Sequence, residues 1–237
     1  MITKLKTMIN FIDVNFPCNE FVKTVTKKDK FIIHHSAGWD NARGMFQSWI
    51  DDERGRVSTA YGINDKGEIY RGFDASKYYG FALGQGLDSN AIPKAWKPYG
   101  AANDASAVQV EICNWGGLYE HMGKFYAWPV YNSKTKIFTY SAKYEVPKEK
   151  VITYEYPFRG RRHFERYTDA EIEALKQLIL YHHEVDGIPL TYNEGMWGIC
   201  ERACKGAAGI WGHISYNAGK SDPHPQPELV EMLQGLK

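Results

Sequence analysis

The sequence predicts a single α/β domain in which helices flank a central mixed β-sheet, with a β-rich appendage inserted into it. Apolar runs typical of strands occur between segments of helical periodicity, an order that favours an α/β or α+β domain built on one sheet. Residues 118–166 show strand-like alternation without a helix, and they are too many for a plain loop. The length of 237 residues is enough for one large domain or two small ones.

The first 28 residues are interpreted as an N-terminal arm, and residues 29–237 as the main domain. The arm is a series of short elements that ends in the polar run TKKDK. The run FIIHHSAG, residues 31–38, predicts a short buried strand that leads into a glycine turn. The next segment, ARGMFQSWIDD, carries Met45, Phe46, Trp49 and Ile50 at helical spacing, so we expect a helix there.

A hairpin, a further strand and a long helix are predicted in the rest of the chain. Residues 59–73, TAYGINDKGEIYRGF, contain two strand-like runs around an Asp-Lys-Gly turn. Residues 106–117, SAVQVEICNWGG, alternate apolar and polar side chains, which predicts a strand with Glu111 near its end. The clearest helix is YTDAEIEALKQLILYHHEVDG. Thr168 caps it, Glu171 completes a capping box and Gly187 closes it.

The composition excludes several classes of function. The net charge of +1 provides no electrostatic case for nucleic acid or an anionic membrane as a partner. No stretch approaches the length of a membrane span, and polar residues interrupt the N-terminal apolar run too soon for a signal peptide, so we expect synthesis in the cytoplasm. The spacing of the cysteines shows no disulfide framework, so free thiols are expected at Cys18, Cys113, Cys200 and Cys204.

Three residues form a candidate metal site. Zinc prefers four tetrahedral positions filled by His, Cys or carboxylate, and two His with one carboxylate is a familiar catalytic set. His34 ends a buried strand, whose rigid backbone can aim an imidazole. His213 and Asp222 share a late proline-containing loop and are far enough apart to turn toward one point. Each residue alone is more typical of a packed histidine or a turn.

Three motifs together give a specific resemblance. FIIHHSAG near the start, VQVEICN in the middle and GHISYNAGKSDPHP near the end follow one another in the order and approximate spacing of a known family pattern. The chain thereby resembles the zinc-dependent N-acetylmuramoyl-L-alanine amidases, which share a fold with peptidoglycan-recognition proteins and many phage endolysins. The resemblance covers about residues 30–116 and 165–226.

The resemblance implies a role for each matched residue. The metal histidines of the family fall on His34 and His213, and the third ligand falls on Asp222, so Zn²⁺ is the implied cofactor. Glu111 matches the glutamate that many bacterial and phage members use as general base. Lys220 occupies the position of the lysine beside the metal, where an ammonium stabilises the oxyanion of the tetrahedral intermediate.

The sequence also departs from the family pattern. Thr59 stands where some members place a catalytic tyrosine. Without that tyrosine, Glu111 is expected to carry out the proton transfer. The family's Asp-Pro-Gly is Asp-Pro-His here, so His224 is expected to be either a substrate contact or an incidental surface residue. YYGFALG, residues 78–84, stands where many relatives have a Trp-His pair. His35 points to the opposite face of its strand and is expected to be structural.

The implied reaction is hydrolysis of the amide between N-acetylmuramic acid and the L-alanine of the peptidoglycan stem peptide. Peptidoglycan or a muropeptide is the implied partner, with neither nucleic acid binding nor membrane insertion. An endolysin without a signal peptide acts on the bacterial cell wall after release through a holin; a cytoplasmic enzyme would instead recycle wall fragments. The insertion at 118–166 and the aromatic content of 14% favour the polymeric wall, and we expect the insertion to lie beside the substrate groove.

Two alternatives come from other functional classes. One is a non-catalytic peptidoglycan-binding module, because some relatives have lost their zinc ligands and only bind. The other is a zinc peptidase that cuts within the stem peptide with a similar ligand set. Peptidoglycan digestion followed by mass spectrometry separates these from the amidase.

Overall fold

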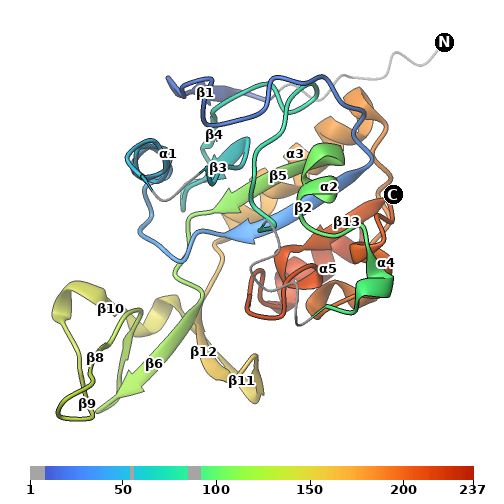
Figure 1. Ribbon diagram of the computed structural model, residues 1–237. Coiled ribbons are helices and arrows are strands. Elements are labelled where there is room, and N and C mark those ends of the chain that lie inside the picture. Colours follow the sequence, from blue (N-terminus) through green and yellow to red (C-terminus); the bar gives the residue numbers. More distant parts are fainter. Residues whose placement is uncertain (1–8, 54–55, 85–91) are drawn as a thin grey trace.

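The computed structural model describes residues 9–53, 56–84 and 92–237, and its centre is a six-stranded mixed sheet (Figure 1). The strand order is β1-β4-β3-β5-β2-β13. Neighbouring strands are parallel except for the antiparallel β3–β4 hairpin. The predicted α/β class with a central mixed sheet is confirmed. The strands are β1 (Phe11–Asp13), β2 (Lys30–His35), β3 (Tyr61–Ile63), β4 (Ile69–Arg71), β5 (Ala107–Ile112) and β13 (Gly209–Gly212).

The helices are mostly short, and α3 is the longest of those in the described ranges. Its capping box forms as predicted, since Thr168 Oγ1 accepts from the Glu171 backbone N–H while the Glu171 carboxylate accepts from the Thr168 backbone N–H. None of the helices in the described ranges is long and apolar enough to cross a membrane. The α-helices are α1 (Ala42–Ile50), α2 (Ala101–Ser106), α3 (Asp169–Asp186), α4 (Glu201–Cys204) and α5 (Pro227–Gln234). The 3-10 helices are η2 (Lys94–Trp96), η3 (Ala142–Tyr144), η4 (Lys148–Lys150), η5 (Glu194–Trp197) and η6 (His213–Ser215).

Strands β2 and β5 form the buried middle of the sheet. All six residues of β2 are buried, because helices cover both faces of the sheet and leave no solvent-facing side. His34 of β2 lies opposite Glu111 of β5, and Gly62 of β3 lies opposite Glu111 in turn. These three residues therefore form a row across one face of the sheet.

The glycine in this row allows α1 to approach the sheet closely. A Cβ at Gly62 would lie 2.8 Å from Met45 Cε and 3.2 Å from Ala42 Cβ, so a larger residue would push α1 away. The missing side chain thus brings one end of α1 close to the row that carries His34 and Glu111.

The described part of the predicted N-terminal arm lies on the main core. Strand β1 adds a parallel edge strand beside β4, and Phe16 and Phe21 belong to the same hydrophobic core as β2 and β5. Two buried aromatic side chains remove a large apolar area from water. The first eight residues lie outside the described part, and the boundary at residue 28 stays a prediction.

The predicted β-rich appendage is a separate antiparallel sheet that projects from one end of the domain (Figure 1). Its strand order is β10-β7-β6-β12-β11, and the β8–β9 hairpin extends from it. Leu118, Phe125, Ala127 and Val146 form a small core of its own. The strands are β6 (Gly117–His121), β7 (Lys124–Tyr126), β8 (Val130–Asn132), β9 (Ile137–Thr139), β10 (Glu145–Val146), β11 (Val151–Phe158) and β12 (Arg161–Glu165).

Candidate metal centre and active-site cavity

The structure brings His34, His213 and Asp222 together at one end of the sheet. Strands β2 and β13 are parallel neighbours, with Ile33 opposite Gly212, so the residues that follow this pair, His34 and His213, lie at the same end of the sheet. Asp222 reaches this edge from the loop that follows η6. Its Oδ2 atom lies 2.9 Å from His213 Nδ1 and 3.5 Å from His34 Nδ1. The pairing of the two strands therefore accounts for the juxtaposition of the histidines.

The geometry of the three residues fits a metal ion. Their ligand atoms all lie within 4.8 Å of one another, and all three residues are buried. Nitrogen and oxygen atoms at about 2.0–2.2 Å from a tetrahedral zinc are roughly 3.3 Å apart, which is close to the two distances to Asp222. Nδ1 of His34 is buried without a hydrogen-bond partner. A free, buried nitrogen directed at a carboxylate and a second imidazole is a donor set suited to zinc.

Burial and neighbouring charges set the protonation of this group. Burial opposes the charged form of His34, but the Asp222 carboxylate and Glu111 outweigh it and raise the pKa of the imidazole. Burial lowers the pKa of His213 to about 4, although Asp222 acts in the opposite direction. The pKa of Asp222 is lowered despite burial, because His213 and His34 stabilise its negative charge. A neutral His213 and an ionised Asp222 are the forms that bind metals.

Behind His34 lie two residues that the sequence interpretation did not include. His34 Nε2 donates to Gln109 Oε1 at 2.9 Å, and Gln109 Nε2 donates to Asp104 Oδ1 at 2.8 Å. The hydrogen on Nε2 leaves Nδ1 free to bind a cation, and such partners fix both the tautomer and the ring orientation. Gln109 lies two residues before Glu111 on β5, on the same face, so strand alternation was the signal that could have found it.

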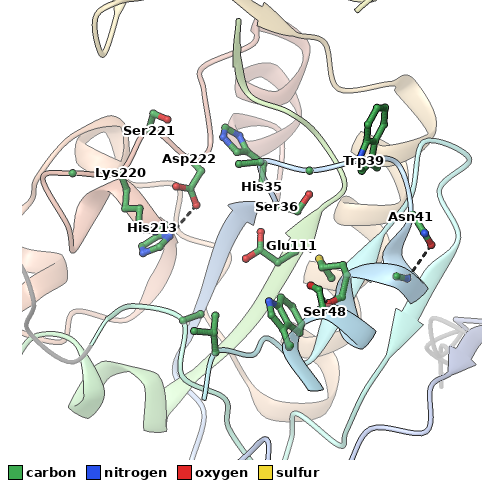
Figure 2. Close-up of a pocket in the computed structure, with 18 residues that line it drawn as sticks. His35, Ser36, Trp39, Asn41, Ser48, Glu111, His213, Lys220, Ser221 and Asp222 are labelled. Atoms are coloured by element: carbon green, nitrogen blue, oxygen red, sulfur yellow. Dashed lines mark hydrogen bonds and ion pairs between the residues drawn. The ribbon is translucent and has the colours of Figure 1, made fainter. Parts of the chain in front are cut away.

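A cavity of about 600 Å³ opens beside the three buried residues, and Glu111 and Lys220 both line it. Figure 2 shows the Glu111 carboxylate projecting between the His213–Asp222 pair and Ser48 of α1. Glu111 Oε2 has no hydrogen-bond partner, and burial raises the pKa of this carboxyl to about 7. A carboxyl with a pKa near neutrality can both accept and release a proton.

The opposite wall of the cavity was missed by the sequence interpretation. Met45, Ser48 and Trp49 line it from α1, and Trp39 lines it from the loop before that helix. The helical spacing of Met45 and Trp49 predicted the helix but not that its side chains line a cavity. Both are partly buried, pack against the core and also line the cavity, whereas Phe46 is fully buried in the core.

His224 was expected to be a substrate contact or an incidental surface residue, and both expectations are wrong. The ring is fully buried and stacks on Tyr167 at a centroid distance of 4.4 Å. The Tyr154 hydroxyl donates to its Nδ1 at 2.7 Å, and its Nε2 donates to the Glu165 carbonyl at 2.9 Å. Because Tyr154 and Glu165 belong to β11 and β12, His224 joins the appendage to the main domain.

The remaining positions noted in the sequence lie close to this site. The Tyr167 hydroxyl donates to His35 Nδ1 at 2.9 Å, which gives this buried histidine a structural partner. His35 also lines the cavity. Thr59 is buried and its hydroxyl donates to the Tyr61 carbonyl, so this side chain is bound to the backbone. Of YYGFALG, Ala82 lines the cavity.

Comparison with known proteins supports the fold. No sequence-family model matches the chain, and no curated protein sequence matches it. A mutant endolysin from Bacillus subtilis has a TM-score of 0.51 at 13% identity, with 97% of this chain and 100% of that chain covered. A mutant of PlyL has a TM-score of 0.52 at 12% identity, with 95% and 97% covered. The catalytic domain of PlyG has a TM-score of 0.51 at 12% identity, with 95% and 92% covered. The chain therefore has the amidase fold that its sequence motifs predict, the fold shared by phage endolysins and peptidoglycan-recognition proteins.

Proposed function

We propose that the protein is a zinc-dependent hydrolase that cleaves the amide between N-acetylmuramic acid and the L-alanine of the peptidoglycan stem peptide. The observation that carries this proposal is the convergence of His34, His213 and Asp222 next to a cavity lined by Glu111 and Lys220. A buried metal-ligand set beside an unpaired carboxyl suits metal-assisted amide hydrolysis, in which the carboxyl moves protons.

The three buried residues would hold the zinc ion. Bound there, zinc supplies a Lewis acid that activates water and polarises the scissile carbonyl. Gln109 would keep the His34 ring in the orientation and tautomer that leave Nδ1 free. His213 and Asp222 need no proton removed near neutral pH, because their pKa values already favour the neutral imidazole and the ionised carboxylate.

Glu111 would move the protons of the reaction. As an anion it takes a proton from the attacking water, and as an acid it donates that proton to the nitrogen of the leaving L-alanine. Its pKa of about 7 suits both steps. The exposed Lys220 ammonium would stabilise negative charge on the carbonyl oxygen as the tetrahedral intermediate forms. Loss of one such group typically costs about 3–4 kcal/mol in activation free energy.

The biological setting follows from the same proposal. Peptidoglycan or a soluble muropeptide would be the partner, and the cell wall would be the site of action, as for an endolysin released through a holin. The open cavity, which continues toward the appendage, suits a polymer better than a small closed substrate.

Mass spectrometry of digested peptidoglycan tests the proposal. The expected products are free stem peptides that begin at L-alanine together with intact glycan strands. Fragments cut inside the peptide would instead identify a zinc peptidase. Tight binding to peptidoglycan without any product, with one equivalent of zinc bound, would identify a binding module.

A further inference from the structure

A second cavity of about 830 Å³ lies where the appendage meets the main domain. The appendage contributes residues of β6, the segment after β7 and the β11–β12 turn, and the main domain contributes the loops after β2 and η6. Its lining shares five residues with the first cavity: His35, Ala37, Gly219, Lys220 and Ser221. The two cavities are therefore parts of one groove that runs from the candidate metal centre to the appendage.

The charged residues that line the second cavity are all cationic. Arg159, Arg161 and Lys220 line it, and its lining contains no Asp or Glu. Within the described ranges, none of these three cations forms an ion pair. Three cations that converge on a cavity without a carboxylate leave a site whose complement is an anion.

Contacts with the protein hold the two arginines in place. The Arg161 guanidinium lies 3.6 Å from the centroid of the Tyr119 ring and donates to the Tyr119 hydroxyl. Arg159, in the β11–β12 turn, donates to the backbone carbonyls of Ala218 and Lys220. These bonds tie the tip of the appendage hairpin to the loop that carries Lys220. A ligand that binds here meets guanidinium groups whose positions are already fixed, which lowers the entropy cost of binding.

An aromatic wall completes the cavity. Trp128 is 57% exposed, and its ring lies 6.1 Å from that of Trp115, which also lines the cavity. Trp115 in turn packs edge-on against Trp39 at 4.9 Å, and Trp39 lines the first cavity. Rings packed in this way offer rigid apolar surface to the carbon skeleton of a ligand along the whole groove.

We propose that this second cavity is a subsite for a carboxylate-bearing part of the stem peptide, with Arg161 as its main anion-binding residue. The identity of the ligand rests on the proposed function. An amide substrate placed at Glu111 has a sugar on the acyl side of the scissile bond and a peptide on the nitrogen side. The sugar chain needs no cationic partner, whereas a peptide attached through its amino group ends in a free carboxylate. Because the charged residues that line this cavity are all cationic, the peptide side of the substrate, rather than the sugar side, fits this end of the groove.

The test is a calorimetric titration with two synthetic stem peptides that lack the sugar and therefore lack the amide that the proposed reaction cleaves. One has free carboxylates, and in the other every carboxylate is amidated. The wild-type protein should bind the free peptide about tenfold to a hundredfold more tightly, the range expected for a charge-assisted hydrogen bond. Arg161→Gln should abolish this preference, whereas Arg161→Lys, which keeps the charge, should retain part of it.

Arg162→Gln is the matched control. Arg162 is the next residue of β12, is exposed, and donates to the Tyr154 carbonyl rather than lining the cavity. This variant should discriminate between the peptides as the wild type does. Equal affinity of the wild type for both peptides, or a preference that survives Arg161→Gln, would overturn the inference. Neither peptide contains the amide that the proposed reaction cleaves, and the titration measures binding, so these results are independent of the digestion products that test the proposed function.

Discussion

Gly212 lies so close to Pro223 that a Cβ on the glycine would be 2.6 Å from Pro223 Cδ. Gly212 immediately precedes His213, and Pro223 immediately follows Asp222. This contact therefore fixes the distance between the two backbone segments that carry these two candidate ligands. A side chain at residue 212 would force those segments apart.

The first prediction is that Gly212→Ala weakens zinc binding. Because ligand atoms must lie within a few tenths of an ångström of their positions, we expect at least a tenfold loss of affinity in a chelator competition. Gly198→Ala is the control, since a Cβ there meets no atom within 4 Å. The wild type should bind about one equivalent of zinc, and His213→Ala should bind none. Unchanged affinity in Gly212→Ala would mean that the loop adjusts freely.

The sequence was most informative where structure is local. The run FIIHH becomes a fully buried strand, because a short run of apolar residues without alternating charged positions suits the middle of a parallel sheet, which is covered on both faces. The capping box at Thr168 and Glu171 also depends only on residues three apart. The candidate ligands were found through the family resemblance, since no local pattern reveals that β2 and β13 are neighbours.

Residues whose roles depend on distant partners were harder to predict. Gln109 is an ordinary polar residue of a strand until His34 lies beside it and donates to it. His224 lies between two prolines in a loop segment that looks exposed, and it is covered by Tyr154 and Glu165 of the appendage, 70 and 59 residues earlier. Spacing alone cannot identify such contacts, because they depend on how the appendage sheet packs on the main domain.

The second prediction concerns Gln109. Gln109→Leu removes the acceptor of the His34 Nε2 hydrogen, so the ring loses the contact that fixes its tautomer and orientation. We expect zinc affinity to fall about tenfold to a hundredfold, as is typical for the partner of a metal-binding histidine. Gln177→Leu, on the exposed side of α3, is the control. Equal zinc affinities in both variants would show that Gln109 only fills space.

The third prediction concerns the rate of hydrolysis. Glu111→Ala should lower kcat about a hundredfold or more while zinc content stays near that of the wild type, because Glu111 transfers protons and is not a ligand. Lys220→Ala should behave likewise through loss of oxyanion stabilisation. Thr59→Ala should have a much smaller effect, since its hydroxyl is bound to the Tyr61 carbonyl. Normal turnover by zinc-loaded Glu111→Ala would exclude Glu111 as the base.

The fourth prediction links Glu111 to the pH dependence of stability. Burial raises the pKa of this carboxyl from 4.5 to about 7 in the folded protein. Between these two values the folded state binds more protons than the unfolded state, so the stability of the metal-free protein falls as pH rises through this window. The contribution of this one group is on the order of 3 kcal/mol.

Glu111→Gln cannot ionise and should therefore lose this part of the pH dependence. In urea unfolding with a chelator present, the variant should gain stability over the wild type at pH 8 and show little difference at pH 4.5. Glu173→Gln, an exposed change on α3, should follow the wild type at both pH values. A Glu111→Gln curve parallel to the wild type would mean that the Glu111 carboxyl is ionised in the folded protein throughout this range.

The last prediction tests whether the appendage contacts the cell wall or only stabilises the fold. Deleting all of residues 118–166 would remove the partners of His224, since Tyr154 and Glu165 lie within this segment. The β8–β9 hairpin is the part to replace, because it forms a two-stranded sheet of its own and exposes Val130, Tyr131, Ile137 and Phe138.

With residues 130–139 replaced by a short Gly-Ser turn, hydrolysis of a small muramyl peptide should stay within about twofold of the wild type, because the cavity beside Glu111 is untouched. Lysis of intact cell wall should fall several-fold, since an exposed cluster of aromatic and aliphatic side chains that could contact the polymer is lost from the appendage. Thermal unfolding checks that the rest of the appendage stays folded around the core of Leu118 and Phe125. An equal loss on both substrates would show that the hairpin supports the catalytic domain and does not contact the wall.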